Sequence, residues 1–306
     1  MAGGQERVLR RRIRSVQSTR KITKAMELIA ASRIVRAQGR IAANRPYRVG
    51  MEKVLRQVVG EDPAMAAKLL GTPEAPTRVG ILAIVGDRGL AGSYNSGVLR
   101  ATERLVAEHK RNGADVTLWT VGKKAPSYFR YRGIDVEHSF TGVADRPEFV
   151  HARDIATAVA TPFAAGQVEI VQLVSTRFIS AGTQRVQTQQ LLPLPLPTEG
   201  ADDVTDNDAL PSTGNTGYTE FEPDVEALLA ELAPRATEAE IFAALLEGAA
   251  SFYTAQQRAM AAATENADEL VRTLTRVMNR ARQDAITTEI MEIVGGAEAL
   301  RQSKGA

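Results

Sequence analysis

Narrow apolar stripes at helical spacing run through both ends of the chain. From about Gln5 to Val59, apolar residues recur three or four positions apart, which is the spacing of one helix face. The members of this stripe are Leu9, Ile13, Val16, Ile22, Met26, Ile29, Ile34 and Ile41. From Glu238 to about Leu300 the chain has no proline, and apolar residues alternate in steps of four and three. This second seam consists of Ala263, Ala267, Leu270, Leu274, Val277 and Ala281. Such a heptad pattern predicts a coiled coil.

The middle of the chain alternates apolar strand-like runs with helical segments. Strands are predicted at Arg78–Val85, Asp115–Val121, Gln167–Thr176 and Thr183–Leu192. Helices are predicted from Asn95 to about Asn112, at Pro126–Arg132 and at Arg153–Ala165. Strands separated by helices are typical of a parallel α/β sheet. Both terminal helices must return to this middle domain, so we expect them to pair antiparallel. The predicted fold class is α/β: a long antiparallel coiled coil of the N- and C-terminal helices plus a central Rossmann-like domain with a parallel sheet.

Composition divides the chain into five parts. Residues 1–59 form the first coiled-coil helix, and residues 60–77, with three prolines and two glycines, read as a linker. The α/β domain is expected at 78–197. Residues 198–223 are acidic and rich in Gly, Asn, Asp and Ser, which is typical of a flexible insertion. Residues 224–306 form the second coiled-coil helix.

Charge is distributed unevenly along the chain. The formal net charge is only +2, but thirteen Lys or Arg residues and two acids lie between Gln5 and Arg48. A basic helix of this kind suits one face of an assembly, and it also suits a nucleic-acid or membrane-surface binding protein. Aromatic residues for stacking on bases are sparse there, with only Tyr47, so the assembly face is favoured. No run of about 18 apolar residues is present, so we expect no membrane span.

Residues suited to catalysis are sparse. The chain has no cysteine and three histidines, none at a metal-ligand spacing from another. The loop G-D-R-G-L-A-G, Gly86 to Gly92, follows a strand and precedes a helix, where a phosphate can bind. It matches neither G-x-G-x-x-G nor the Walker pattern, which favours a structural turn over a nucleotide site in a free α/β enzyme. The sequence therefore predicts no catalytic residues, no cofactor and no bound metal.

Three stretches resemble one protein family. Ile286–Ala299 reads I-T-T-E-I-M-E-I-V-G-G-A-E-A and resembles the ATP synthase gamma chain signature I-T-x-E-x-x-E-x-x-x-G-A-x-A at every fixed position. Arg10–Arg33 is similar to the N-terminal helix of that family. Gly86–Asn95 resembles its D-R-G-L-x-G-x-x-N segment. These stretches lie at both ends and in the centre, so the resemblance covers nearly the whole chain.

The resemblance implies a rotor shaft that has no active site of its own. Two antiparallel helices would stand inside a ring of three alpha and three beta subunits, and the α/β domain would lie against the epsilon subunit and the c-ring of Fo. The shaft would couple proton flow to ATP synthesis at the beta subunits, on the cytoplasmic face of the bacterial cell membrane. No nucleic acid is implied, and membrane contact would come only through Fo. The residues expected to contact partners are Lys24, Met26, Arg282, Gln283, Thr287 and Glu289.

Overall fold

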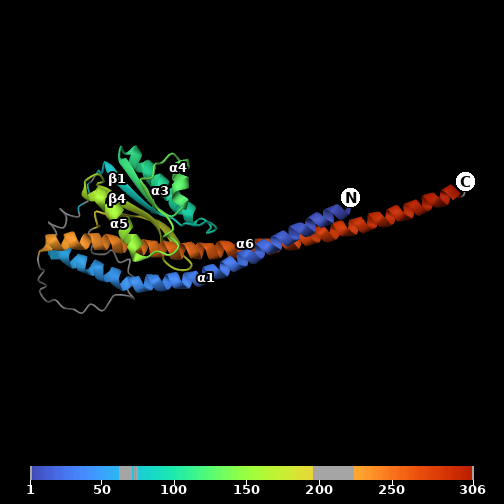
Figure 1. The fold of residues 1–306 in the computed structure, drawn as a ribbon, viewed down its shortest axis with the longest axis horizontal. Coiled ribbons are helices and arrows are strands. Elements are labelled where there is room, and N and C mark those ends of the chain that lie inside the picture. The colour runs from blue at the N-terminus through green and yellow to red at the C-terminus, as the bar shows by residue number, and fades with distance from the viewer. Residues whose placement is uncertain (1, 62–70, 72, 74, 196–223, 305–306) are drawn as a thin grey trace. The chain divides into compact units, whose positions relative to one another are not determined.

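The computed structural model describes residues 2–61, 71, 73, 75–195 and 224–304. It divides into two compact units, Met1–Ala31 with Gln256–Ala306, and Ser32–Ala255. Helices α1 (Ala2–Glu61) and α6 (Val225–Lys304) each contribute residues to both units (Figure 1). The expected acidic insertion at 198–223 and most of the expected linker lie outside the described residues. The five-part division of the chain stays a prediction.

The second unit contains a five-stranded sheet in the order β3-β2-β1-β4-β5. Parallel pairing joins β1 to β2, β1 to β4, and β2 to β3. The strands are β1 (Arg78–Ile84), β2 (Asp115–Val121), β3 (His138–Phe140), β4 (Ile170–Phe178) and β5 (Gln184–Leu192). The central strands β1 and β4 are almost wholly buried, as expected for parallel strands covered on both faces.

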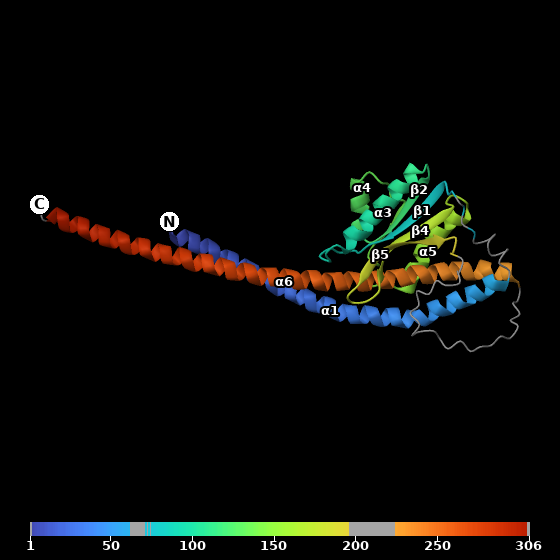
Figure 2. The same ribbon diagram turned by 180° about the vertical axis from the view of Figure 1, so that it is seen from behind.

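One edge of the sheet differs from the prediction of a parallel sheet. Strand β5 pairs antiparallel with β4, beside which it lies in Figure 2. The two strands are separated by only five residues, 179–183, and so short a connection can join only antiparallel neighbours. At the other edge, β3 has only three residues and was not predicted.

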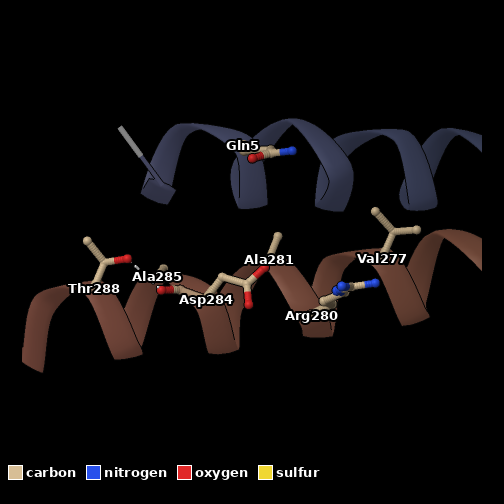
Figure 3. Close-up of a pocket in the computed structure, with 7 residues that line it drawn as sticks. All are labelled: Gln5, Val277, Arg280, Ala281, Asp284, Ala285 and Thr288. Atoms are coloured by element: carbon tan, nitrogen blue, oxygen red, sulfur yellow. Dashed lines mark hydrogen bonds between the residues drawn. The ribbon is translucent and has the colours of Figure 1, made fainter. Parts of the chain in front are cut away.

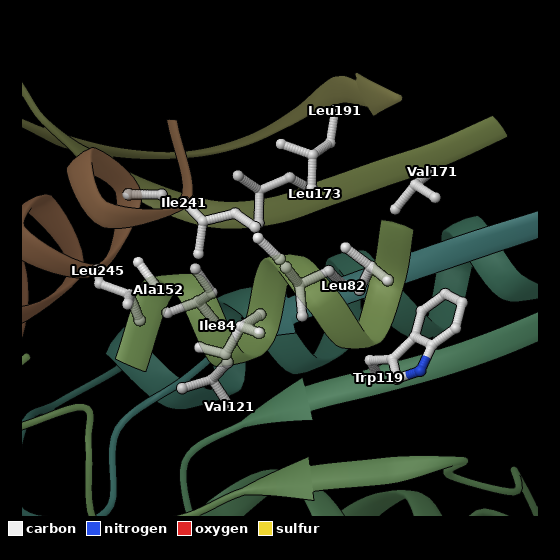
Figure 4. Packing of buried hydrophobic residues seen from close by; sticks show 14 of the residues in the cluster. Leu82, Ile84, Trp119, Val121, Ala152, Val171, Leu173, Leu191, Ile241 and Leu245 are labelled. Atoms are coloured by element: carbon white, nitrogen blue, oxygen red, sulfur yellow. The ribbon is translucent and has the colours of Figure 1, made fainter. Parts of the chain in front are cut away.

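Helices cover both faces of the sheet. On one face, α3 (Tyr94–Arg111) and α4 (Lys124–Tyr131) pack against Val79, Ile81 and Ala83 of β1. On the other, α5 (Phe149–Ala164) and α6 pack against Leu82 and Ile84. Figure 4 shows Ile241 and Leu245 of α6 in this second cluster, beside Ala152 of α5. Part of α6 therefore belongs to the core of the α/β domain.

Gly80 makes room for the single tryptophan. A Cβ atom at Gly80 would lie 2.6 Å from Cζ3 of Trp119, which is 2% exposed and stands on the neighbouring strand β2. Contacts this close do not occur between real Cβ atoms and their neighbours. The glycine in the middle of β1 is therefore explained by the close approach of a large side chain.

The first unit is a pair of antiparallel helices. Gln5 of α1 lies beside residues 277–288 of α6, Arg20 beside Asp268, and Thr23 beside Thr264, so the partner number falls as the α1 number rises. Together with the five-stranded α/β domain, this confirms the predicted fold class.

The predicted seam of α6 needs a correction. Ala267 and Leu274 are buried as expected, but Leu270 and Val277 are 40% and 45% exposed. The seam in the structure alternates steps of four and three through a different set of residues: Met260, Thr264, Ala267, Val271, Leu274, Met278, Ala281 and Ala285, all buried or half-buried. The prediction missed this register because it excluded the polar Thr264, which occupies a seam position.

Candidate functional site

The interface between the helices of the first unit is narrow and partly polar. The hydroxyls of Thr23 and Thr264 lie 2.8 Å apart in a buried hydrogen bond. Ala30 and Ala267, also buried, have side chains too small to fill a wide core. Arg20 and Asp268 form an ion pair at 2.5 Å on the partly exposed flank of the interface. So thin an apolar seam leaves most of both helices exposed.

The end of α6 is exposed on all sides. Every described side chain from Ile286 to Ala297 is exposed, although five of them are large and apolar. These are Ile286, Ile290, Met291, Ile293 and Val294, with exposures of 49%, 55%, 67%, 71% and 58%. At 3.6 residues per turn they cover an arc of roughly 160°, with Glu289 and Glu292 on the opposite side. A helix with so wide an apolar face is normally covered by other protein.

A shallow groove lies at the N-terminal end of α1. It has a volume of about 290 Å³ and lies between Gln5 and residues Val277 to Thr288 of α6 (Figure 3). Its lining includes one cation, Arg280, and one anion, Asp284. The Thr288 hydroxyl donates to the Asp284 carbonyl 2.9 Å away, so it is already engaged. A groove with so few convergent polar groups does not have the chemistry of an active site.

The predicted contact residues form two separate groups. Arg282, Gln283, Thr287 and Glu289 are all exposed on α6. Arg282 and Glu289 are seven residues apart and share one face, while Gln283 and Thr287 share another. Lys24 and Met26 lie on α1. Lys24 is exposed and pairs with Glu27 at 3.0 Å, and Met26 is half-buried. Because Gln5 marks the level of the Arg282 group, Lys24 lies roughly 28 Å further along the helix pair.

The glycine-rich loop holds itself in place through internal hydrogen bonds. The Asn95 side chain accepts from Gly86 N and donates to the Arg88 carbonyl, both at 2.8 Å. The Asp87 carboxylate accepts from three backbone amides, those of Lys123, Gly142 and Ala144, at 2.8 to 3.1 Å. Its polar side chains are thus already engaged within the protein, which supports the structural interpretation over a nucleotide site.

A second set of polar contacts surrounds Asp145. Its carboxylate pairs with Arg88 at 2.7 Å, and its carbonyl accepts from the Tyr253 hydroxyl at 2.9 Å. Arg33 donates to that hydroxyl at 3.4 Å and stands 5.3 Å from the centre of the Tyr253 ring. Burial raises the pKa of Asp145, and the Arg88 guanidinium opposes that rise. We call Arg33, Arg88, Asp145 and Tyr253 the Asp145 network; sequence patterns alone did not reveal it.

Glu247 of α6 lies in a third set of polar contacts. It accepts from Phe178 N of β4 at 3.2 Å and lies 3.6 Å from Arg48 of α1, which also pairs with Glu240 at 3.3 Å. Burial raises the pKa of the Glu247 carboxyl, while Arg48 lowers it.

The described ranges contain neither a candidate metal-binding cluster nor a candidate membrane-spanning helix. Among these residues no group of three or more His, Cys, Asp or Glu side chains could hold a metal ion. Within the same ranges, no helix combines the length and apolar character needed to cross a membrane.

Comparison with known proteins assigns the family. A family model described as ATP synthase matches residues 5–300. An ATP synthase gamma chain from Parafrankia sp. (strain EAN1pec) is 46% identical over 301 residues, covering 97% of this chain and 98% of that protein. The chain belongs to the ATP synthase gamma chain family. Another family member, from Acidothermus cellulolyticus, is 43% identical over 302 residues, again with 97% of this chain and 98% of that protein covered.

Solved structures share the fold of this gamma chain family member. A chain from the Euglena gracilis mitochondrial ATP synthase, described as OSCP/F1/c-ring in rotational state 3, aligns with a TM-score of 0.65 at 17% identity. The alignment covers 99% of this chain and 97% of that one. A chain from the Tetrahymena thermophila mitochondrial ATP synthase central stalk and c-ring aligns with a TM-score of 0.60 at 24% identity, covering 79% and 99%. At these identities the likeness concerns the fold.

Proposed function

We propose that this chain is the central rotor shaft of a bacterial F1Fo ATP synthase. Its paired helices turn inside a ring of three alpha and three beta subunits, and its α/β domain meets the epsilon subunit and the c-ring. Rotation driven by proton flow through Fo would then change the nucleotide affinity of each beta subunit in turn. The interpretation of the basic α1 helix as a nucleic-acid or membrane-surface binder has no support in the family assignment.

The exposed end of α6 carries this proposal. Residues 286–297 place five large apolar side chains in solvent over an arc of roughly 160°. A partner on one side could cover this apolar face, but it would not reach Glu289 and Glu292 on the opposite side. A ring of subunits around the helix covers the apolar face and also brings polar groups to the two glutamates. Because one side of the helix is apolar and the other carries Glu289 and Glu292, each subunit of the ring would face a different surface of the helix.

The chain would act without catalytic groups of its own. Asp87, Asp145 and Glu247 are each already engaged by backbone amides or arginine side chains. Mg-ATP and the residues that cleave or form it would belong to the partner subunits. The same proposal places the chain at the cytoplasmic face of the cell membrane, bound there through Fo.

Co-expression with the alpha and beta subunits of the same organism tests the proposal. We expect a stoichiometric complex with Mg-ATPase activity that survives gel filtration. Replacing Ile290 and Ile293 with Ser should weaken that complex, because both side chains lose apolar burial against the ring. Replacing the exposed Val150 and Ile179 of the α/β domain with Ser provides a matched control, because the proposal places this domain outside the ring.

Two results would contradict the proposal. One is failure of the wild-type chain to join the alpha and beta subunits. The other is tight, salt-sensitive binding of the isolated chain to DNA or to anionic vesicles, which would restore the basic-helix interpretation.

A further inference from the structure

Asp87, which follows a strand of the sheet, accepts hydrogen bonds from the backbone of the segment 142–147. One carboxylate oxygen accepts from Gly142 N at 2.8 Å and from Lys123 N at 3.1 Å, and the other accepts from Ala144 N at 3.0 Å. Asp87 follows β1, and Lys123 precedes α4. The segment is therefore connected to the ends of two structural elements of the α/β domain.

The same segment also accepts hydrogen bonds from side chains of the long helices α1 and α6. The Tyr253 hydroxyl of α6 donates to the Asp145 carbonyl, and Arg33 of α1 donates to that hydroxyl. Further along α1, the Arg40 guanidinium donates to the Pro147 carbonyl. Two carbonyls of one short segment thus receive hydrogen bonds that originate on α1 and α6, and all these residues lie in the second compact unit.

These contacts differ in kind from the apolar contacts of α6 with the sheet, and they add to the hydrogen bond that Glu247 of α6 accepts from Phe178 N of β4. Ile241 and Leu245 are buried against β1 and α5, but apolar contact has no preferred direction and permits sliding. Hydrogen bonds weaken steeply when their angle changes, so they resist rotation of one element against another. The Asp145 carboxylate adds an ion pair with Arg88 in the glycine-rich loop.

We propose that the Asp145 network and Asp87 form the torque-bearing attachment between the α/β domain and the two long helices, with Tyr253 and Arg33 as its positioning residues. This inference rests on the proposed rotor function. It assigns a role to the glycine-rich loop, whose Asp87 and Arg88 are the contacts of that loop within the attachment. The path runs from α1 and α6 through two carbonyls and the 142–147 backbone to Asp87.

Torsional stiffness of the assembled complex tests the inference directly. The chain has no cysteine, so the exposed Ala107 of α3 can be changed to Cys and labelled as a single thiol on the α/β domain. With cysteine-free alpha and beta subunits immobilised and the complex stalled without ATP, the angular variance of the label reports compliance between domain and helices. Each lost hydrogen bond lowers the equilibrium constant between the attached and the detached arrangement by about fivefold. Tyr253→Phe loses the two hydrogen bonds of its hydroxyl, so it should raise the angular variance roughly twofold.

A matched substitution separates attachment from general loosening. Tyr128→Phe also removes one hydroxyl, which donates to Glu103 at 2.6 Å, but that bond joins α4 to α3 and touches neither long helix. It should leave the variance unchanged. Tyr253→Phe keeps the ring and its edge contact with Phe252 at 5.5 Å, so the fold should persist. Hydrogen exchange at Gly142 and Ala144 in the complex should also accelerate in Tyr253→Phe alone.

The outcomes distinguish the inference from the function on which it rests. An unchanged variance in Tyr253→Phe, or an equal rise in Tyr128→Phe, would overturn the attachment while leaving the rotor intact. Failure of the unlabelled wild-type chain to assemble would instead contradict the proposed function, and the attachment with it.

Discussion

Thr23 of α1 and Thr264 of α6 meet hydroxyl to hydroxyl, 2.8 Å apart, inside the helix interface. Each hydroxyl also lies within reach of a carbonyl on its own helix, Arg20 O at 3.0 Å and Met260 O at 2.8 Å. Two hydroxyl hydrogens therefore serve three contacts, and one threonine must donate across the interface while the other donates to its own helix. A polar pair of this kind favours one register of a coiled coil over its neighbours.

Replacement of both threonines by valine tests that pairing. Each single Thr→Val change should lower the free energy of unfolding by about 1 kcal/mol, because it removes a buried hydrogen bond. The double variant should lose less than the sum of the two, because two methyl groups then replace the paired hydroxyls. Urea unfolding of the full chain, followed by circular dichroism, measures all four proteins. Strict additivity would show that the hydroxyls do not interact.

Glu247 should make stability depend on pH. Burial raises the pKa of its carboxyl in the folded chain, so the folded state holds the proton more tightly than the unfolded state. This contribution to stability is full below the ordinary carboxyl pKa of about 4.5 and is lost as the pH rises through the raised folded value. Glu247→Gln cannot titrate, so its stability relative to wild type should increase over that interval.

The measurement is the midpoint of thermal unfolding of both proteins from pH 4 to pH 8. Gln retains an oxygen that can accept from Phe178 N, so the hydrogen bond at 3.2 Å can persist in the variant. The net rise in the pKa of Glu247 already includes the opposing contact with Arg48 at 3.6 Å, so losing that contact does not reverse the predicted direction. A difference between the two proteins that stays constant across this range would show that Glu247 does not titrate differently in the folded chain.

Asp87 should matter for stability and not for nucleotide binding. In Asp87→Asn an amide nitrogen replaces one carboxylate oxygen, which leaves at least one of the three backbone amides without an acceptor. The expected loss is about 1–3 kcal/mol in the free energy of unfolding. Equilibrium dialysis of the wild-type chain with ATP should show no saturable binding. An unchanged stability together with tight ATP binding would revive the nucleotide-site interpretation of the loop.

The spacing of apolar residues predicted the long helices and most strands correctly, because each of these segments buries at least one side along much of its length. Strand Asp115–Val121 was predicted with the bounds it has in the structure, since its apolar run ends at turns on both sides. The α6 heptad was recognised, but its register was placed one position early at Leu270 and Val277. Where a seam is made of Ala, Thr and Met, apolar character alone does not identify which neighbouring positions face the partner.

Contacts between distant segments leave no local signal. Tyr253 and Asp145 are 108 residues apart, and the hydroxyl of one meets the backbone carbonyl of the other, a group that every residue has. Strand β3 has three residues, too few for a periodic pattern. The contact residues Arg282, Gln283, Thr287 and Glu289 came from the family resemblance of residues 278–299, and no contact within this chain tests them, so their roles stay predictions.

Arg282 and Gln283 give the sharpest test of that resemblance. Both side chains are exposed on α6, and alanine favours helix as strongly as either, so changing both to Ala should leave the thermal midpoint of the chain nearly unchanged. In the assembled complex, the double variant lacks the guanidinium N–H donors of Arg282 and the side-chain amide of Gln283. ATP turnover, or ATP synthesis relative to hydrolysis, should therefore fall by roughly tenfold, which is the effect of losing one or two charge-assisted hydrogen bonds. Arg282→Lys keeps the positive charge but loses the planar guanidinium that can donate two parallel hydrogen bonds, so it should retain part of the activity. Normal coupling in the double variant, or a fall in its thermal midpoint that accounts for the loss, would remove both residues from the coupling surface.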